Sequence, residues 1–184
     1  MGFFNIFKKK VNDTDKLEQS INDFKKLWNT NDLTQIWKIE DKNDFIISLY
    51  GYLSKKCEYG DKIDNLLPHE KVIYFCQAFE GEINNGGFSQ FFFNSTGDFT
   101  METVDSLKII GAVKTTKLLK KAVTLFPSGI VPKDRDKREE MLDELLNDEN
   151  EELLSELDNS FYQYEDNLLE LNYDYVLLNK SNFS

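Results

Sequence analysis

The sequence contains few of the residues on which several functional classes depend. Its 184 residues include two cysteines, one histidine and three prolines. Cys57 and Cys76 lack the close spacing of a zinc site and are too few for a disulfide framework, so we expect a reducing, cytoplasmic setting. No apolar run approaches the roughly 18 residues that a membrane-spanning helix needs.

An excess of positive charge is also missing. The chain has 22 basic and 33 acidic residues, a formal charge of −11. Proteins that bind nucleic acids or anionic membrane surfaces usually present basic surfaces to them. We therefore expect neither direct nucleic-acid binding nor membrane binding. The 40% hydrophobic and 14% aromatic content nevertheless predicts a folded core.

Apolar residues recur at spacings of three and four through most of the chain, which is typical of helices. The segments with this pattern are residues 14–28, 32–40, 44–58, 68–84, 88–94, 100–112, 115–126, 135–158 and 160–178. For 88–94 a strand is the alternative, because aromatic runs also favour strands. The sequence predicts an all-α fold of about eight or nine helices. We expect a flexible end over 1–12 and a single domain over 13–184.

The negative charge is concentrated in the last third of the chain. Residues 134–174 contain sixteen acidic and three basic residues, a formal charge of −13, whereas the remainder carries +2. Five carboxylates recur every fourth residue: Glu140, Glu144, Asp148, Glu152 and Glu156. On one continuous helix each step rises about 6 Å, which would form a slow spiral of charge. The spiral is either a solvated face or a surface for a basic partner; a metal cluster is disfavoured because calcium loops carry a turn glycine, which is missing here.

Residues 82–98, Glu-Ile-Asn-Asn-Gly-Gly-Phe-Ser-Gln-Phe-Phe-Phe-Asn-Ser-Thr-Gly-Asp, form the least ordinary stretch. Its glycines permit a sharp turn, and its amides lie among phenylalanines, where they need hydrogen-bond partners. The segment is either a helix break whose amides bind loop backbone groups or the floor of a pocket or contact surface. The residues that we single out are Asn85, Gly86, Gly87, Phe88, Gln90, Asn94 and Gly97.

Recognisable catalytic motifs are missing. The sequence has no nucleophile elbow, no phosphate-binding glycine loop and no metalloprotease motif. His69 and Cys76 are seven residues apart, about 10 Å along a helix, which is too far for a nucleophile pair. We therefore expect no catalytic residue, no metal site and no cofactor.

Three segments together resemble the signature of the bacterial DNA-mimic protein family of the DMP type. They are residues 84–98, the run Leu107, Ile110, Gly111 and Ala112, and the late pattern Leu157, Asp158, Phe161 and Tyr162. The resemblance covers about residues 45–178. It implies an all-helical, acidic, cytoplasmic protein. The characterised type member is understood to dimerise and to present acidic side chains in place of DNA phosphates to a transcription factor.

Charge and resemblance lead to one main hypothesis of function. We expect a non-enzymatic, acidic, protein-binding regulator that mimics DNA and occupies a transcription factor or another basic protein, with the spiral over 140–156 as its contact surface. A homodimer is the candidate assembly. One alternative is an immunity-type protein that binds a toxin through the same surface. Another is an enzyme or small-molecule binder that uses the Asn85–Asn94 segment.

Overall fold

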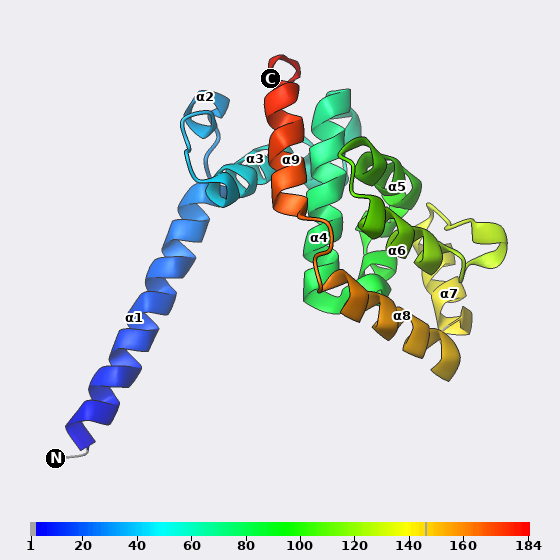
Figure 1. Ribbon diagram of the computed structural model, residues 1–184, viewed down its shortest axis with the longest axis horizontal. Helices are drawn as coiled ribbons and strands as arrows, with labels where there is room; N and C mark the ends of the chain where they lie inside the picture. The colour runs from blue at the N-terminus through cyan, green and yellow to red at the C-terminus, as the bar shows by residue number, and fades with distance from the viewer. Residues whose placement is uncertain (1–2, 146) are drawn as a thin grey trace. The chain divides into compact units, whose positions relative to one another are not determined.

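The protein is all-α. The computed structural model describes the backbone of residues 3–145 and 147–184, and the side chains of 16–145 and 147–184. Over this part of the chain there are nine α-helices and no strand, which confirms the predicted fold class (Figure 1). The helices are α1 (Phe3–Trp28), α2 (Leu33–Ile36), α3 (Lys42–Lys56), α4 (Pro68–Phe93), α5 (Thr100–Ile109), α6 (Val113–Val123), α7 (Arg135–Leu145), α8 (Asp148–Phe161) and α9 (Leu168–Leu178).

The chain groups into two compact units, residues 1–52 and 53–184. In the first unit, Trp28 at the end of α1 packs edge-on against Tyr50 of α3, with 5.4 Å between ring centroids. α1 begins at Phe3, before the predicted start at residue 14. The side chains of the predicted flexible end, 1–12, lie outside the described residues. Its flexibility and the single domain over 13–184 stay predictions.

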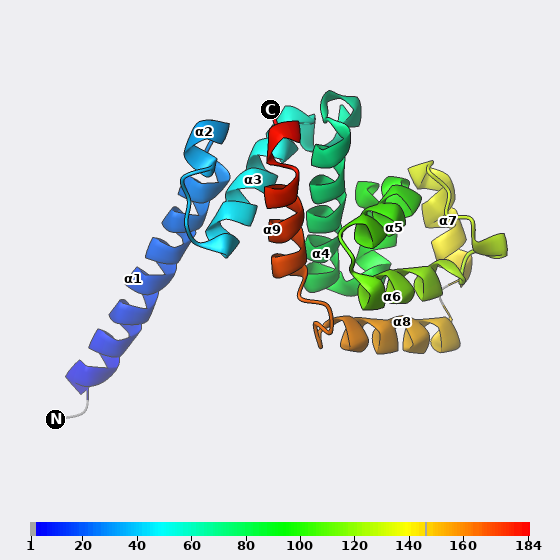
Figure 2. The ribbon, with the colours of Figure 1, turned by 45° about the horizontal axis from the view of Figure 1, so that its top comes forward.

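The second unit is built around α4. This helix packs against α5, α7, α8 and α9, and Figure 2 shows α9 along one side of it and α5 along the other. Phenylalanines fill the interior: Phe79 contacts Phe91 and Phe161 at ring distances of 5.0 and 5.8 Å. Phe92 contacts Phe126 at 4.9 Å. Phe88, Phe91 and Phe92 are buried, whereas Phe93 is half-exposed. The segment is helical as far as Phe93, so the strand alternative is wrong.

α4 consists of two helical segments joined at Gly86 and Gly87. Gly86 has φ −162° and ψ 22°, and Gly87 has φ 74° and ψ −171°, so neither is helical. The positive φ at Gly87 is a conformation that glycine adopts without steric cost. The predicted helix break at this position is confirmed.

The predicted continuous helix over 135–158 is wrong. α7 ends at Leu145, and α8 begins at Asp148 with Asn147 as its N-cap. The Asn147 side chain accepts a hydrogen bond from Asn150 N (3.0 Å), and Asn150 Nδ2 donates to the Leu145 carbonyl (2.6 Å). Each amide satisfies one backbone group, Asn150 N at the start of α8 or the Leu145 carbonyl at the end of α7, which is why asparagine here competes with helix continuation.

Two other predicted elements have different boundaries. The segment 32–40 contains only the short helix α2. The closing helix begins at Leu168 and not near residue 160, because α8 continues to Phe161. Asn167 then caps α9 by accepting a hydrogen bond from Glu170 N.

Candidate functional site

The five predicted contact carboxylates lie on two helices. Glu140 and Glu144 belong to α7, whereas Asp148, Glu152 and Glu156 belong to α8. All five are exposed. Because the helix is interrupted at 147, they do not form the one continuous spiral that the sequence predicted.

The strongest concentration of charge is on α8. This helix contains six acidic residues and no basic one, and three of the carboxylates lie in its first turn, where the helix dipole favours negative charge. Its opposite face is buried through Leu154, Leu157 and Phe161. We call the exposed carboxylates the α8 acidic face: Asp148, Glu149, Glu151, Glu152 and Glu156.

The side chains of the α8 acidic face form no hydrogen bond or ion pair with any residue that the structure describes. The neighbouring arginines are paired elsewhere. Arg135 pairs with Glu139 at 2.7 Å, and Arg138 is fully buried and pairs with Asp98 at 2.6 Å. Arg138 therefore contributes no positive charge to the surface, and α8 presents its carboxylates to solvent uncompensated.

The amides of the glycine-containing motif converge on one carboxylate. Gln90 Nε2 and Asn94 Nδ2 donate to Glu82 Oε2 at 2.6 and 2.8 Å, and the Thr96 hydroxyl donates to Glu82 Oε1 at 3.2 Å. Asn85 Nδ2 donates to Gln90 Oε1 at 3.1 Å. The expectation that these amides bind loop backbone groups is therefore wrong about the acceptor. Glu82 lies at the start of the stretch singled out from the sequence, but its role as acceptor was not predicted, because the kink between it and the amides is what brings them together.

Asp158 belongs to the late pattern Leu157, Asp158, Phe161 and Tyr162, and it contacts the stretch that contains Gly86 and Gly87. Its Oδ1 accepts a hydrogen bond from Phe88 N at 2.8 Å, which supplies a cap where the second segment of α4 begins. A Cβ on Gly87 would lie 2.2 Å from Asp158 Oδ2, so the close approach requires glycine. Burial raises the pKa of the Asp158 carboxyl, and the Phe88 N–H acts in the opposite direction. Two of the three segments quoted for the resemblance are thus in direct contact.

Arg138 ties α7 to the end of α4. Its Nε donates to the Phe92 carbonyl at 2.5 Å and its Nη2 to the Asn94 carbonyl at 2.9 Å. Its Nη1 donates to the Pro132 carbonyl at 2.7 Å. The last carbonyls of a helix have no partners within it, and this arginine satisfies that of Phe92 and that of the C-cap residue Asn94. The sequence offered no signal for this role, since Arg138 is simply one of three basic residues in an acidic segment.

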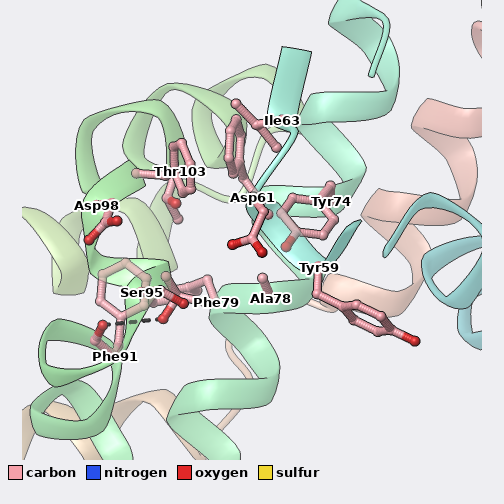
Figure 3. Close-up of a pocket in the computed structure, with 14 residues that line it drawn as sticks. Tyr59, Asp61, Ile63, Tyr74, Ala78, Phe79, Phe91, Ser95, Asp98 and Thr103 are labelled. Carbon is pink, nitrogen blue, oxygen red and sulfur yellow. Dashed lines mark hydrogen bonds between the residues drawn. The ribbon is translucent and has the colours of Figure 1, made fainter. Parts of the chain in front are cut away.

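A cavity of about 300 Å³ lies in the second unit, beside η3 (Ser95–Phe99) and α5 (Figure 3). Phe91 lines it, but Asn85, Gln90 and Asn94 do not. The amides on which the small-molecule alternative would depend therefore do not line this cavity.

The other residues considered for chemistry, His69 and the two cysteines, lie in contacts within the fold. His69 Nδ1 lies 2.7 Å from the Tyr175 hydroxyl, and both cysteines are buried. Among the described residues, no three His, Cys, Asp or Glu side chains gather in a way that could hold a metal ion. None of the described helices is long and apolar enough to cross a membrane.

Together these features define a class of all-helical proteins. Their core is rich in phenylalanine, polar side chains hold the kinked helix in place, and one acidic helix is exposed. Residues 64–179 match the family model described as DMP19-like protein, so the chain belongs to the DMP19-like protein family. The matched region includes α4 to α9 and confirms the resemblance, although it begins later than residue 45. No curated protein and no solved structure matches the chain.

Proposed function

We propose that this protein is a non-enzymatic, cytoplasmic regulator that binds a basic, DNA-binding protein through the α8 acidic face and so occupies the surface that would hold DNA. One observation carries the proposal. Five exposed carboxylates lie on a single helix that has no basic residue, and none is paired within the described chain. A partner's lysines and arginines would therefore displace no internal ion pair.

The spacing on α8 suits a partner that reads phosphates. Asp148, Glu152 and Glu156 follow one another every fourth residue, so each step rises about 6 Å along the helix. Successive phosphates of one DNA strand repeat about every 3.4 Å along the axis, but their path winds around it, so their separation is comparable. The break at Asn147 limits this row to three carboxylates. Glu140 and Glu144 on α7 would make secondary contacts.

Exposed charges of this kind mainly raise the rate at which two proteins associate. They attract a basic surface over distances near the Debye length, about 8–10 Å at physiological salt, and they gain little from each individual ion pair. The proposed complex should therefore form quickly at low salt and weaken as salt is added.

The test compares two triple variants with the same change in net charge. Asp148→Asn/Glu152→Gln/Glu156→Gln neutralises the α8 row, and Glu18→Gln/Asp23→Asn/Glu40→Gln neutralises three exposed carboxylates of the first unit. Partners captured from bacterial lysate are identified, purified and titrated at several salt concentrations. At low salt the α8 variant should bind about tenfold or more weakly, since each exposed ion pair contributes up to about 1 kcal/mol. The control should bind within about twofold of the wild type.

Three outcomes contradict the proposal: an affinity that does not change with salt, an α8 variant that binds like the control, or a partner for which duplex DNA does not compete. A captured toxin that does not bind DNA would favour the immunity-type alternative. The family resemblance also suggests a homodimer, which would double the number of acidic faces; sedimentation equilibrium of the purified chain tests that assembly.

A further inference from the structure

The cavity beside η3 has aromatic walls. Phe75 and Phe99 pair on one side with 5.1 Å between ring centroids, and Phe79 and Phe91 pair at 5.0 Å. Its volume of about 300 Å³ is at the lower end of the range of small-molecule sites. The lining residues include none of the α8 acidic face, so the cavity is a separate feature of the second unit.

Two carboxylates line this cavity, and only one is compensated. Asp98 Oδ1 accepts a hydrogen bond from the buried Arg138 at 2.6 Å. The exposed Asp61 carboxylate forms no hydrogen bond or ion pair with the described residues, and Figure 3 shows it directed toward the middle of the lining side chains. The cavity therefore presents one uncompensated negative charge beside apolar rings.

A threonine hydroxyl also lines the cavity. Thr103 is only 1% exposed, and its side chain makes no hydrogen bond to any described residue. Because Thr103 lies on the cavity wall, its hydroxyl is available to a group bound in the cavity (Figure 3).

We propose that the cavity binds a small organic cation, in which an ammonium group is attached to a compact aromatic body. The ammonium would pair with Asp61, and the ring would pack against the phenylalanine walls, where a nearby cation is also attracted by the ring faces. The Thr103 hydroxyl would hydrogen-bond a polar group of the ligand. An anion would be repelled by Asp61, and a neutral ligand would lack the charge-assisted hydrogen bond.

The test uses three probes of similar shape and different charge, measured by calorimetry and by amide chemical shifts on the intact chain. The probes are 2-phenylethylamine, which is cationic at neutral pH, neutral 2-phenylethanol and anionic phenylacetate. We expect saturable binding of the amine, about tenfold weaker binding of the alcohol and no binding of phenylacetate. Shifted amides should cluster around residues 59–63, 74–79 and 95–103.

Two variants test how much the Asp61 carboxylate and the Thr103 hydroxyl contribute to binding. Asp61→Asn should weaken amine binding about tenfold and leave alcohol binding unchanged. Asp143→Asn, which neutralises an exposed carboxylate on α7, is the matched control and should change neither. Thr103→Val keeps the shape of the side chain, removes the hydroxyl and should weaken binding about threefold or more without loss of thermal stability.

The proposal is overturned if the amine shows no saturable binding, if the alcohol binds equally well, or if Asp61→Asn binds the amine like the wild type. The neutralised α8 triple variant should keep full amine binding. This separates the cavity from the proposed partner surface, so that either proposal can fail while the other stands.

Discussion

Replacing Arg138 by methionine should cost this fold much of its stability. The guanidinium is completely buried and donates to four main-chain carbonyls, those of Phe92, Asn94, Pro132 and Lys133, as well as to the Asp98 carboxylate. Methionine is of similar length but donates nothing. The variant therefore leaves buried carbonyls without their donor and Asp98 without its counter-charge.

The expected loss is about 4 kcal/mol. Each buried acceptor left unsatisfied costs about 1–3 kcal/mol, and removing one partner of a buried ion pair typically costs about 3–5 kcal/mol. These costs overlap, because water can enter the space that the guanidinium leaves. The total stability of such a domain is about 5–15 kcal/mol, so the variant should be folded only marginally.

Urea denaturation followed by circular dichroism at 222 nm measures the effect. With a slope near 2 kcal/mol per molar urea, the midpoint should fall by about 2 M. Arg135→Met is the control, because its half-exposed ion pair with Glu139 should contribute less than about 1 kcal/mol. If Arg138→Met loses no more stability than Arg135→Met, the role assigned to this arginine is wrong.

Two further predictions concern the contacts of the motif. Burial raises the folded-state pKa of Asp158, so its contribution to stability is present at low pH and is lost as pH rises through that pKa. Asp158→Asn keeps an acceptor for Phe88 N–H and should gain stability relative to the wild type between about pH 4 and about pH 7; a difference that stays constant across these pH values would refute this. Gly97→Ala would place a Cβ 2.7 Å from Arg138 Nε and 2.8 Å from the Phe92 carbonyl, and should lose about 1–3 kcal/mol in urea denaturation. Gly81→Ala has open space around it within α4 and should gain up to about 1 kcal/mol; equal effects of the two substitutions would contradict the geometry.

Periodicity and glycine chemistry predicted the helical part of this fold well. The apolar spacing identified most of the helices, and the pair Gly86 and Gly87 identified the kink in α4. These are local signals, because a helix face repeats along the chain and a positive φ selects glycine at one position. The break between α7 and α8 was also encoded locally, in Asn147 and Asn150, but the acidic and leucine pattern runs through it without interruption. Pattern reasoning therefore joined two helices into one.

The candidate sites were less predictable, since their partners are distant in sequence. Asp158 contacts Phe88 across 70 residues, and Arg138 contacts the Phe92 carbonyl across 46. Neither pairing follows from spacing. Asp158 was singled out only as part of the late pattern of the resemblance, and Arg138 looked like an ordinary member of a charged surface. The same holds for the cavity, where Asp61 and Thr103 come from separate elements and meet only in the folded chain.

The sequence by itself determined that this protein is helical, that its motif bends a helix, and that its negative charge is concentrated after residue 133. All three are properties of neighbouring residues. Only the tertiary structure decided which charged side chains face solvent and which form hydrogen bonds or ion pairs within the protein. Glu82, Asp98, Arg138 and Asp158 hold the motif together, whereas Asp148, Glu152 and Glu156 remain unpaired on the described surface. The reason is that a charge is compensated by whatever the fold places within about 4 Å of it, and chain order does not specify that neighbour.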